Sequence, residues 1–371
     1  MKRRRAIGLI AAAAAIGAGV AGYESLAQST TMSTDRLARM RHSPNFDGKR
    51  FINPIPTENS MTVRKLYDVS RKYFAADGSL RKPAGAMPVV YGLPGHDSPR
   101  PQQGWRFWWL GHAGLLMDID GLRILTDPVL DRRVSLNQYI GPSRLHPAPI
   151  EPEDLPEADL VILSHNHFDH LDKRTIGALA TKGRRFVCPL GVGHWLERYG
   201  VAPERVTELD WWEETKIGNH TITSAPARHF SGRGLRDRDA TQWASFGIKG
   251  PHTNVYFAGD SGEMPAQYAE IGKRLGPFAL SFMPIGAYNT MWHDIHTDPD
   301  EALDAHKAID GGIVMPIHWA TYDLALHPWA EPVARFVERA QRDNLAYVTP
   351  KVGEMVNTAN LPMEAWWLPL V

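Results

Sequence analysis

Short apolar runs separated by turn residues begin near residue 105 and continue to the C-terminus. Runs rich in Val, Ile, Leu and aromatic residues predict strands, and apolar residues spaced three or four apart predict helices. The predicted strands cover residues 106–110, 115–119, 123–126, 159–163, 185–187, 206–209, 220–224, 242–248, 255–258, 279–284, 313–317 and 345–348. The predicted helices cover residues 173–180, 193–199, 267–275, 299–309 and 331–342.

Local signals support several of these boundaries. Asp120 and Gly121 form a good two-residue hairpin turn between the second and third strands. Asp298, Pro299 and Glu301 supply the cap, the first-position proline and the third-position glutamate that start a helix. Strands come first and then alternate with helices, which favours an α+β protein with mixed sheets covered by helices.

The chain before residue 105 has a different texture. Residues 29–60 are polar and residues 83–101 are rich in proline, so both predict leader or linker material, with a short helix at 66–74 between them. We therefore divide the chain into an N-terminal segment 1–28, a leader or linker region 29–104 and one folded domain 105–371.

The N-terminal segment 1–28 has the pattern of an export signal. A basic stretch at 2–5 precedes an uncharged run at 6–23, and Ser25-Leu26-Ala27 offers a small-residue cleavage site. Without cleavage, the run is long enough to serve as a membrane anchor. We expect an exported protein, periplasmic or anchored to the outer face of the inner membrane. The alternative is the N-terminal helix of a cytoplasmic protein.

Composition excludes several classes of function. The chain has 41 Lys and Arg residues and 41 Asp and Glu residues, so its net charge is zero. It therefore lacks the net positive charge that would indicate a nucleic-acid partner. Cys188 is the single cysteine, which excludes an internal disulfide and zinc sites built on two or more cysteines. The 16 histidines are numerous, and histidine is the commonest metal ligand.

The strongest chemical signal is the segment 164–172, Ser-His-Asn-His-Phe-Asp-His-Leu-Asp. It follows an apolar run and carries His165, His167, Asp169 and His170. Neutral imidazole and carboxylate are good ligands for zinc. Four ligands in one loop do not easily saturate one tetrahedral ion and leave an open position, so two metals with further ligands from elsewhere are the better interpretation.

The further ligands are expected at the ends of later strands. His229, Asp260 and His318 each follow an apolar run, at 220–224, 255–258 and 313–317 respectively. Open sheets place their active sites at the carboxyl ends of strands. These residues are therefore the candidates that complete the site.

The motif HxHxDH, followed by His, Asp and His at successive strand ends, resembles the zinc signature of the metallo-β-lactamase superfamily. Within it, the chain is similar to the N-acylphosphatidylethanolamine-hydrolysing phospholipase D family over about residues 105 to 350. The similarity rests on the segments 109–113 (WLGHA), 125–128 (LTDP), 141–142 (GP), 209–214 (LDWWEE), 257–260 (FAGD), 270–274 (EIGKR) and 283–288 (MPIGAY).

This resemblance implies an αββα sandwich of two mixed β-sheets flanked by helices and a site with two Zn²⁺ ions. One zinc would be held by His165, His167 and His229. The other would be held by Asp169, His170 and His318, with Asp260 bridging the two. The implied reaction is attack of a metal-bound hydroxide on the phosphorus of a phosphodiester, with Asp169, Asp260 and His296 as the catalytic residues. His296 matches a histidine that touches the phosphoryl group.

Alternatives remain open at this stage. A lactonase or another small-molecule metallohydrolase on the same fold would share every metal ligand, and a non-catalytic zinc-binding protein is a third interpretation. His296 is equally a candidate helix-capping residue, and Asp127 and His112 are either supports for ligands or turn residues. The expected partner is a phospholipid or small-molecule substrate, with association at a membrane surface and oligomerisation left open.

Overall fold

A computed structural model describes residues 32–58, 63–75, 78–181, 183–234 and 236–371 of the chain. The expected signal or anchor segment 1–28 lies outside the described residues. Among the helices that are described, none combines the length and the apolar character needed to cross a bilayer.

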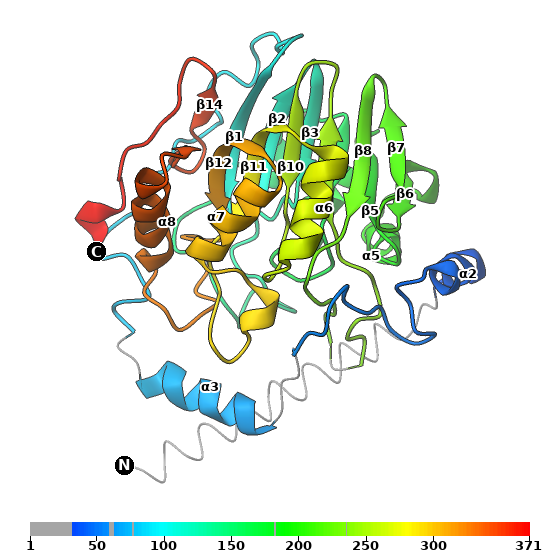
Figure 1. Cartoon of the computed structure of the whole chain (residues 1–371), viewed down its shortest axis with the longest axis horizontal. Helices are drawn as coiled ribbons and strands as arrows, with labels where there is room; N and C mark the ends of the chain where they lie inside the picture. Colours follow the sequence, from blue (N-terminus) through cyan, green and yellow to red (C-terminus); the bar gives the residue numbers. More distant parts are fainter. Residues whose placement is uncertain (1–31, 59–62, 76–77, 182, 235) are drawn as a thin grey trace.

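Two seven-stranded sheets form the centre of the molecule (Figure 1). The first has the strand order β14-β1-β2-β3-β4-β5-β6 and the second the order β13-β12-β11-β10-β9-β8-β7. The first sheet contains β1 (Trp105–Gly111), β2 (Gly114–Ile119), β3 (Leu122–Thr126), β4 (Leu160–Ile162), β5 (Arg185–Pro189), β6 (Val206–Leu209) and β14 (Met355–Asn357). The second contains β7 (Glu214–Ile217), β8 (His220–Ala225), β9 (Ser245–Lys249), β10 (Asn254–Phe257), β11 (Phe278–Pro284), β12 (Gly311–Ile317) and β13 (Ala346–Tyr347).

Helices cover the outer faces of both sheets. Figure 1 shows three of them, labelled α6, α7 and α8, lying across the second sheet. The helices are α2 (Thr34–His42), α3 (Val63–Ala75), α4 (Lys173–Ala180), α5 (Gly193–Arg198), α6 (Pro265–Leu275), α7 (Pro299–Ala308) and α8 (Glu331–Arg342). Four short 3-10 turns are η1 (Pro152–Asp154), η2 (Pro203–Arg205), η3 (His293–Ile295) and η4 (Leu368–Leu370). The expected αββα sandwich is confirmed.

Strand β1 shows how the layers are held together. All seven of its residues are buried, and successive side chains point to opposite faces of the sheet. Phe107 and Trp109 pack in the core between the sheets, where the Phe107 ring meets Phe282 edge-on at 5.1 Å between centroids. Trp108 and Leu110 pack in a second core under α4 and α5. A strand buried on both faces reads as a continuous apolar run, because neither face needs polar residues.

The predicted elements occur within three residues of their expected bounds, and one helix and two strands of the described residues were not predicted. Strand β7 is an edge strand whose burial pattern is mostly exposed or intermediate, so it carries no apolar run. Strand β14 has a single buried residue, Val356. Helix α2 is strongly polar and buries only Met40. Strand β14 pairs with the distant strand β1, and Met40 of α2 packs in the core between the sheets. Strand β7 pairs with its neighbour β8 across a two-residue turn, and it was not predicted because it carries no apolar run.

The region 29–104, for which the sequence predicts leader or linker material, also contributes to both cores. Met40, Phe51, Met87 and Leu93 are buried, with exposed fractions between 0% and 7%. The first three join the core between the sheets and Leu93 joins the second core. The region is polar in composition, but its few apolar side chains fill positions at the edge of the sandwich.

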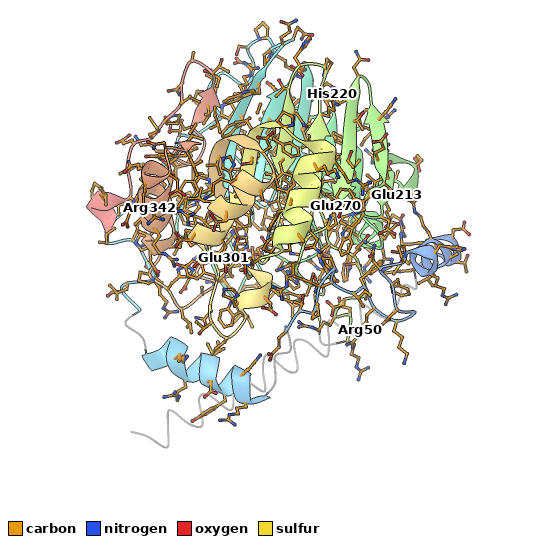
Figure 2. The ribbon with its side chains drawn as sticks, viewed as in Figure 1. Arg50, Glu213, His220, Glu270, Glu301 and Arg342 are labelled. Atoms are coloured by element: carbon orange, nitrogen blue, oxygen red, sulfur yellow. The ribbon has the colours of Figure 1, made fainter. Side chains whose placement is uncertain are left out.

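The start of α7 confirms the predicted cap. The Asp298 carboxylate accepts hydrogen bonds from the main-chain N–H groups of Asp300 and Glu301, at 2.9 and 3.0 Å. Glu301, which Figure 2 labels, accepts a hydrogen bond in return from the Asp298 N–H at 3.0 Å. Asp298 also accepts a hydrogen bond from Arg335 of α8 at 2.7 Å. The cap thus fixes the entry of α7 and its contact with α8.

Replacing Asp298 by alanine is expected to lower the free energy of unfolding by about 1 to 2 kcal/mol, because two helix N–H groups lose their acceptor. Chemical denaturation of the two proteins measures the difference. Asp304→Ala is a matched control on the same helix, since Asp304 makes only exposed ion pairs with Lys307 and Arg339 and its loss should cost less than about 0.5 kcal/mol. Equal effects of the two variants would contradict the role of the cap.

Candidate metal centre

The candidate ligands meet at one edge of the sandwich, where several strands end. The segment 164–172 follows β4, and three later strands, β8, β10 and β12, are each followed by one candidate ligand. These residues are His229, Asp260 and His318. Gly259 allows one of these close approaches, since it has a φ of +58° and a Cβ there would lie only 2.5 Å from the Ser164 Cβ. The structure thus brings all three residues to the edge where the segment 164–172 lies.

Three histidines form the first group. His165 Nε2 lies 2.8 Å from His167 Nδ1, and His229 Nε2 lies 3.2 Å from the same atom. His165 and His229 are almost fully buried, with exposed fractions of 1% and 0%. Three ring nitrogens so close together, in positions that are compatible with one shared ion, form a suitable set of metal ligands.

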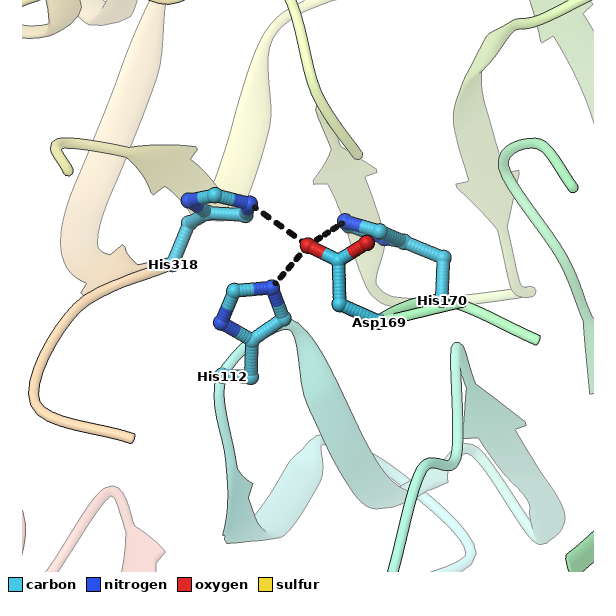
Figure 3. A group of neighbouring side chains, drawn as sticks. All are labelled: His112, Asp169, His170 and His318. Atoms are coloured by element: carbon cyan, nitrogen blue, oxygen red, sulfur yellow. Dashed lines mark hydrogen bonds and ion pairs between the residues drawn. The ribbon is translucent and has the colours of Figure 1, made fainter. Parts of the chain in front are cut away.

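The second group surrounds the carboxylate of Asp169 (Figure 3). Asp169 Oδ2 lies 2.8 Å from His112 Nε2, 3.4 Å from His318 Nε2 and 3.6 Å from His170 Nε2. Figure 3 shows the three rings pointing at this oxygen from three separate chain segments. The four residues could together hold a second metal ion.

Asp260 lies between the two groups. Its Oδ2 is 3.1 Å from the Nε2 atoms of both His170 and His318. The same oxygen is 3.6 Å from His229 Nε2 and 3.9 Å from His165 Nε2. One carboxylate oxygen therefore faces ring nitrogens of both groups, which is the geometry needed to bridge two ions.

Unpaired polar atoms at this centre show that the residues suit a metal. His170 Nε2, His318 Nε2 and Asp260 Oδ1 are buried and make no hydrogen bond within the described structure. Buried polar atoms nearly always have a partner, so three unpaired ones at a single point need an explanation. Imidazole nitrogens and carboxylate oxygens in such a cluster are the donor set that zinc and similar divalent ions prefer.

A layer of contacts behind the ligands sets their orientation. Asp127 Oδ2 lies 2.6 Å from His170 Nδ1 and accepts a hydrogen bond from the Ser164 hydroxyl at 2.5 Å. Ser164 Oγ in turn lies 2.9 Å from His165 Nδ1. The Ile295 carbonyl lies 2.8 Å from His229 Nδ1. Partners on the Nδ1 side leave Nε2 free to face a metal, and Asp127 is thus a support for ligands.

Burial sets the protonation state of the first group. It is the main cause that lowers the pKa of His167 and of His229, each to about 3. It also lowers the pKa of His165 well below the ordinary value, and the neighbouring His170 and His167 add to the effect. These three rings are therefore neutral at physiological pH, which is the form that binds metal.

The second group behaves differently. Burial alone would lower the pKa of His318, but the carboxylates of Asp260 and Asp169 outweigh it and raise the pKa to about 9. Burial alone would also lower the pKa of His170. The carboxylates of Asp260, Asp169 and Asp127 outweigh it and raise that pKa well above the ordinary value. Two rings of this group therefore carry a proton at neutral pH when no metal is bound.

His296 stands beside both groups without joining the helix cap. Its ring centroid lies 5.1 Å from those of His229 and His318, and its Nδ1 is buried without a hydrogen-bond partner. Burial, the main cause, holds the pKa of His296 well below the ordinary value. The cap of α7 is Asp298, so the alternative role of His296 as a capping residue is not supported.

His112 was left open by the sequence, and the structure brings it into the second group. It lies between β1 and β2 with a left-handed φ of +55°, and its ring faces Asp169. The signal in the sequence was its position in a short turn between two strands that end at this edge. By contrast, Asp172 caps α4, because its carboxylate accepts a hydrogen bond from the Thr175 N–H at 2.6 Å.

A small hollow of about 20 Å³ lies beside the second group. His318 forms part of its wall, together with other polar and charged residues that include Arg81, Asp323 and His327. Apolar and aromatic side chains, among them Leu145, Trp319 and Tyr322, line the rest. The hollow has room for about one water molecule.

Metal loading should depend on pH in the direction set by the second group. A metal must displace the protons of His170 and His318, so loading at pH 7 should release protons. For the same reason, the apparent affinity for the metal should rise as the pH increases towards about 9. The histidines of the first group are already neutral and should release no protons. Calorimetric titration with Zn²⁺ in buffers of different ionisation enthalpy measures the release. Binding heats that do not depend on the buffer would contradict this assignment.

Comparisons with known proteins agree with this geometry. Residues 122–319 match the model of a beta-lactamase superfamily domain. An uncharacterized protein of Mycobacterium tuberculosis is 38% identical over 377 residues, which cover 98% of this chain and 99% of the relative. N-acyl-phosphatidylethanolamine-hydrolyzing phospholipase D 1 of Caenorhabditis elegans is 32% identical over 332 residues, covering 84% of this chain and 93% of the relative.

A solved structure supports the fold. A metallo hydrolase from the archaeon Ignicoccus hospitalis has a TM-score of 0.51 and 22% identity, over 69% of this chain and 98% of that protein. The chain therefore belongs to the metallo-β-lactamase superfamily, as a metal-dependent hydrolase that is related over most of its length to N-acylphosphatidylethanolamine-hydrolysing phospholipase D.

Proposed function

We propose that this protein is a zinc-dependent phosphodiesterase of the phospholipase D type that hydrolyses N-acylphosphatidylethanolamine-like phospholipids. The observation that carries the proposal is the position of His296, whose unpaired ring nitrogen lies beside both ligand groups. A phosphodiester presents non-bridging oxygens that need a donor besides the metals. The nematode relative, named for this activity, supports the substrate class.

The residues of the chain divide the work in this proposal. His165, His167 and His229 would hold one zinc, Asp169, His170 and His318 the other, and Asp260 would bridge them. His112 would support Asp169 or complete the second set. Bound zinc ions supply an acidified water and neutralise charge on phosphoryl oxygens.

His296 has a specific part. Its lowered pKa keeps the imidazole neutral, so the ring carries one N–H that can donate to a phosphoryl oxygen and one nitrogen that can accept. A neutral ring is suited to orient the phosphodiester and to stabilise developing charge on oxygen. In the proposed reaction it therefore acts as a hydrogen-bond donor to the substrate and not as a resident imidazolium.

A location at a membrane would suit a lipid substrate. The basic and apolar pattern of residues 1–28 favours export and would bring the enzyme to bilayer lipids. We accordingly propose a site of action at the outer face of the inner membrane or in the periplasm.

Purified protein loaded with Zn²⁺ is expected to release N-acylethanolamine and phosphatidic acid from N-acylphosphatidylethanolamine in detergent micelles, and a chelator should abolish this release. The assay offers a panel of lactones and simple phosphodiesters in parallel. The double variant His165→Ala, His167→Ala is the inactive control, since it removes two ligands of the first group. Full activity in that variant would refute the metal site, and turnover of lactones alone would favour the small-molecule hydrolase.

His296→Ala is expected to lower kcat on the phospholipid by about 100-fold, the usual cost of removing one donor to a developing oxyanion. Zinc content should stay that of the unmodified protein, because the two proposed ligand sets are complete without His296, although its ring also lies within reach of an ion held by His229 and Asp260. Steady-state kinetics and elemental analysis measure the two quantities. His293→Ala is a matched control, since His293 is half-exposed and pairs with Glu301 at 2.8 Å outside the centre. An unchanged kcat in the His296 variant would remove the proposed role.

A further inference from the structure

Residues 51–58, named here the N-terminal strap, run along the loop that carries His229. The Asn53 side chain forms two hydrogen bonds with the main chain of that histidine. Its Nδ2 donates to the His229 carbonyl at 2.8 Å, and its Oδ1 accepts from the His229 N–H at 2.9 Å. The two residues are 176 positions apart in the chain. A paired amide contact of this kind fixes both the position and the tilt of the peptide that it holds.

The strap is attached to the same loop at a second point. Arg228 donates to the Pro56 carbonyl at 2.7 Å and to the Thr57 hydroxyl at 3.1 Å. Arg228 also forms an ion pair with Asp294 at 2.8 Å, and Asp294 accepts a hydrogen bond from the Glu58 N–H at 2.7 Å. The strap therefore links the His229 loop to the 3-10 turn η3, which lies directly before His296.

The start of the strap is itself fixed to the body of the protein. Phe51 is 3% exposed and lies in the core between the sheets, where it packs on Phe46 with 4.9 Å between ring centroids. The Phe51 N–H donates to the Asp239 carbonyl, and the Ile52 N–H donates to the Asn45 carbonyl, each at 2.8 Å. Asn53 thus has a firm base from which to hold another loop.

We infer that Asn53 is a positioning residue for the first metal-ligand group. It holds His229 so that the His229 Nε2 faces the His167 Nδ1, which the His165 Nε2 also faces. The inference rests on the proposed metal centre. The Ile295 carbonyl fixes the ring of His229 from its Nδ1 side, and Asn53 fixes its main chain. Together the two contacts determine where Nε2 points.

The effect of losing Asn53 should be selective. The second group is carried by loops after β4 and β12 and by the turn at His112, and the hydrogen bonds of Asn53 go to none of these segments. Without Asn53, His229 keeps its ring contact but loses the two bonds that anchor its peptide. One of two bound metals should therefore weaken while the other keeps its affinity.

The test is a titration of the metal-free full chain with Zn²⁺ in competition with a chelating dye, which resolves tighter and weaker sites. For Asn53→Ala we expect the affinity of one site to fall by about 10-fold or more, as for other residues that orient metal ligands. Asn254→Ala is the matched control. Asn254 is also half-buried and donates to two carbonyls, of Leu275 at 2.6 Å and Pro277 at 2.9 Å. It is the first residue of β10, at the opposite end of that strand from Asp260.

The outcomes separate the inference from the function on which it rests. If the unmodified protein binds no Zn²⁺, the metal centre and the inference both fail. If it binds Zn²⁺ and Asn53→Ala binds equally well at every site, the inference alone fails. Should Asn53→Ala not fold, as judged by circular dichroism, Thr57→Val removes one strap hydroxyl and should weaken the same site to a smaller degree. An unchanged affinity in that variant would then overturn the inference.

Discussion

One buried and one largely buried carboxylate among imidazole rings are the feature on which the structure of this site depends. Asp260 is 3% exposed, and Asp169 is enclosed by three rings. Buried charges of this kind are costly unless opposite charge surrounds them. The high pKa values of His170 and His318 show the compensation that the chain itself can supply. A divalent ion supplies the same compensation more completely, because it replaces mobile protons with a fixed charge.

That constraint explains the architecture around it. The ligands come from loops that are far apart in sequence, and only the ends of several strands at one edge can bring them within 4 Å of one carboxylate oxygen. The sheets hold those strands rigidly because β1 and its neighbours are buried on both faces. A rigid scaffold with ligands on its loops fixes the distances between donors, and the contacts of Asp127 and Ser164 fix their directions.

The sequence predicts the parts of this arrangement whose cause is local. The segment 164–172 contains its own ligand pattern, and the strand-end rule adds His229, Asp260 and His318. Turn and cap signals at Asp120 and Asp298 locate elements for the same reason, since the residues that interact are neighbours in the chain. The bounds of α4 and α8 agree with the predicted ranges, because both helices have clear apolar spacing.

What could not be predicted depends on contacts between distant residues. Strand β14 has one buried residue and forms because the distant strand β1 pairs with it. His112 reaches Asp169 across 57 positions, and Asn53 reaches His229 across 176. The turn between two strands marks His112 as a candidate but does not identify its partner, and Asn53 lies in a polar segment where asparagine is common.

The extent of the folding unit follows from these distant contacts. The superfamily model matches residues 122–319, yet strands β1 and β2, His112 and the N-terminal strap all lie before residue 122. Strand β1 contributes side chains to both hydrophobic cores. His112 and Asn53 contact candidate ligands directly. A fragment restricted to the matched residues would therefore lack part of the core and part of the support of both ligand groups. The described residues before 105, for which the sequence predicts leader or linker material, pack into both cores and contact a candidate metal ligand.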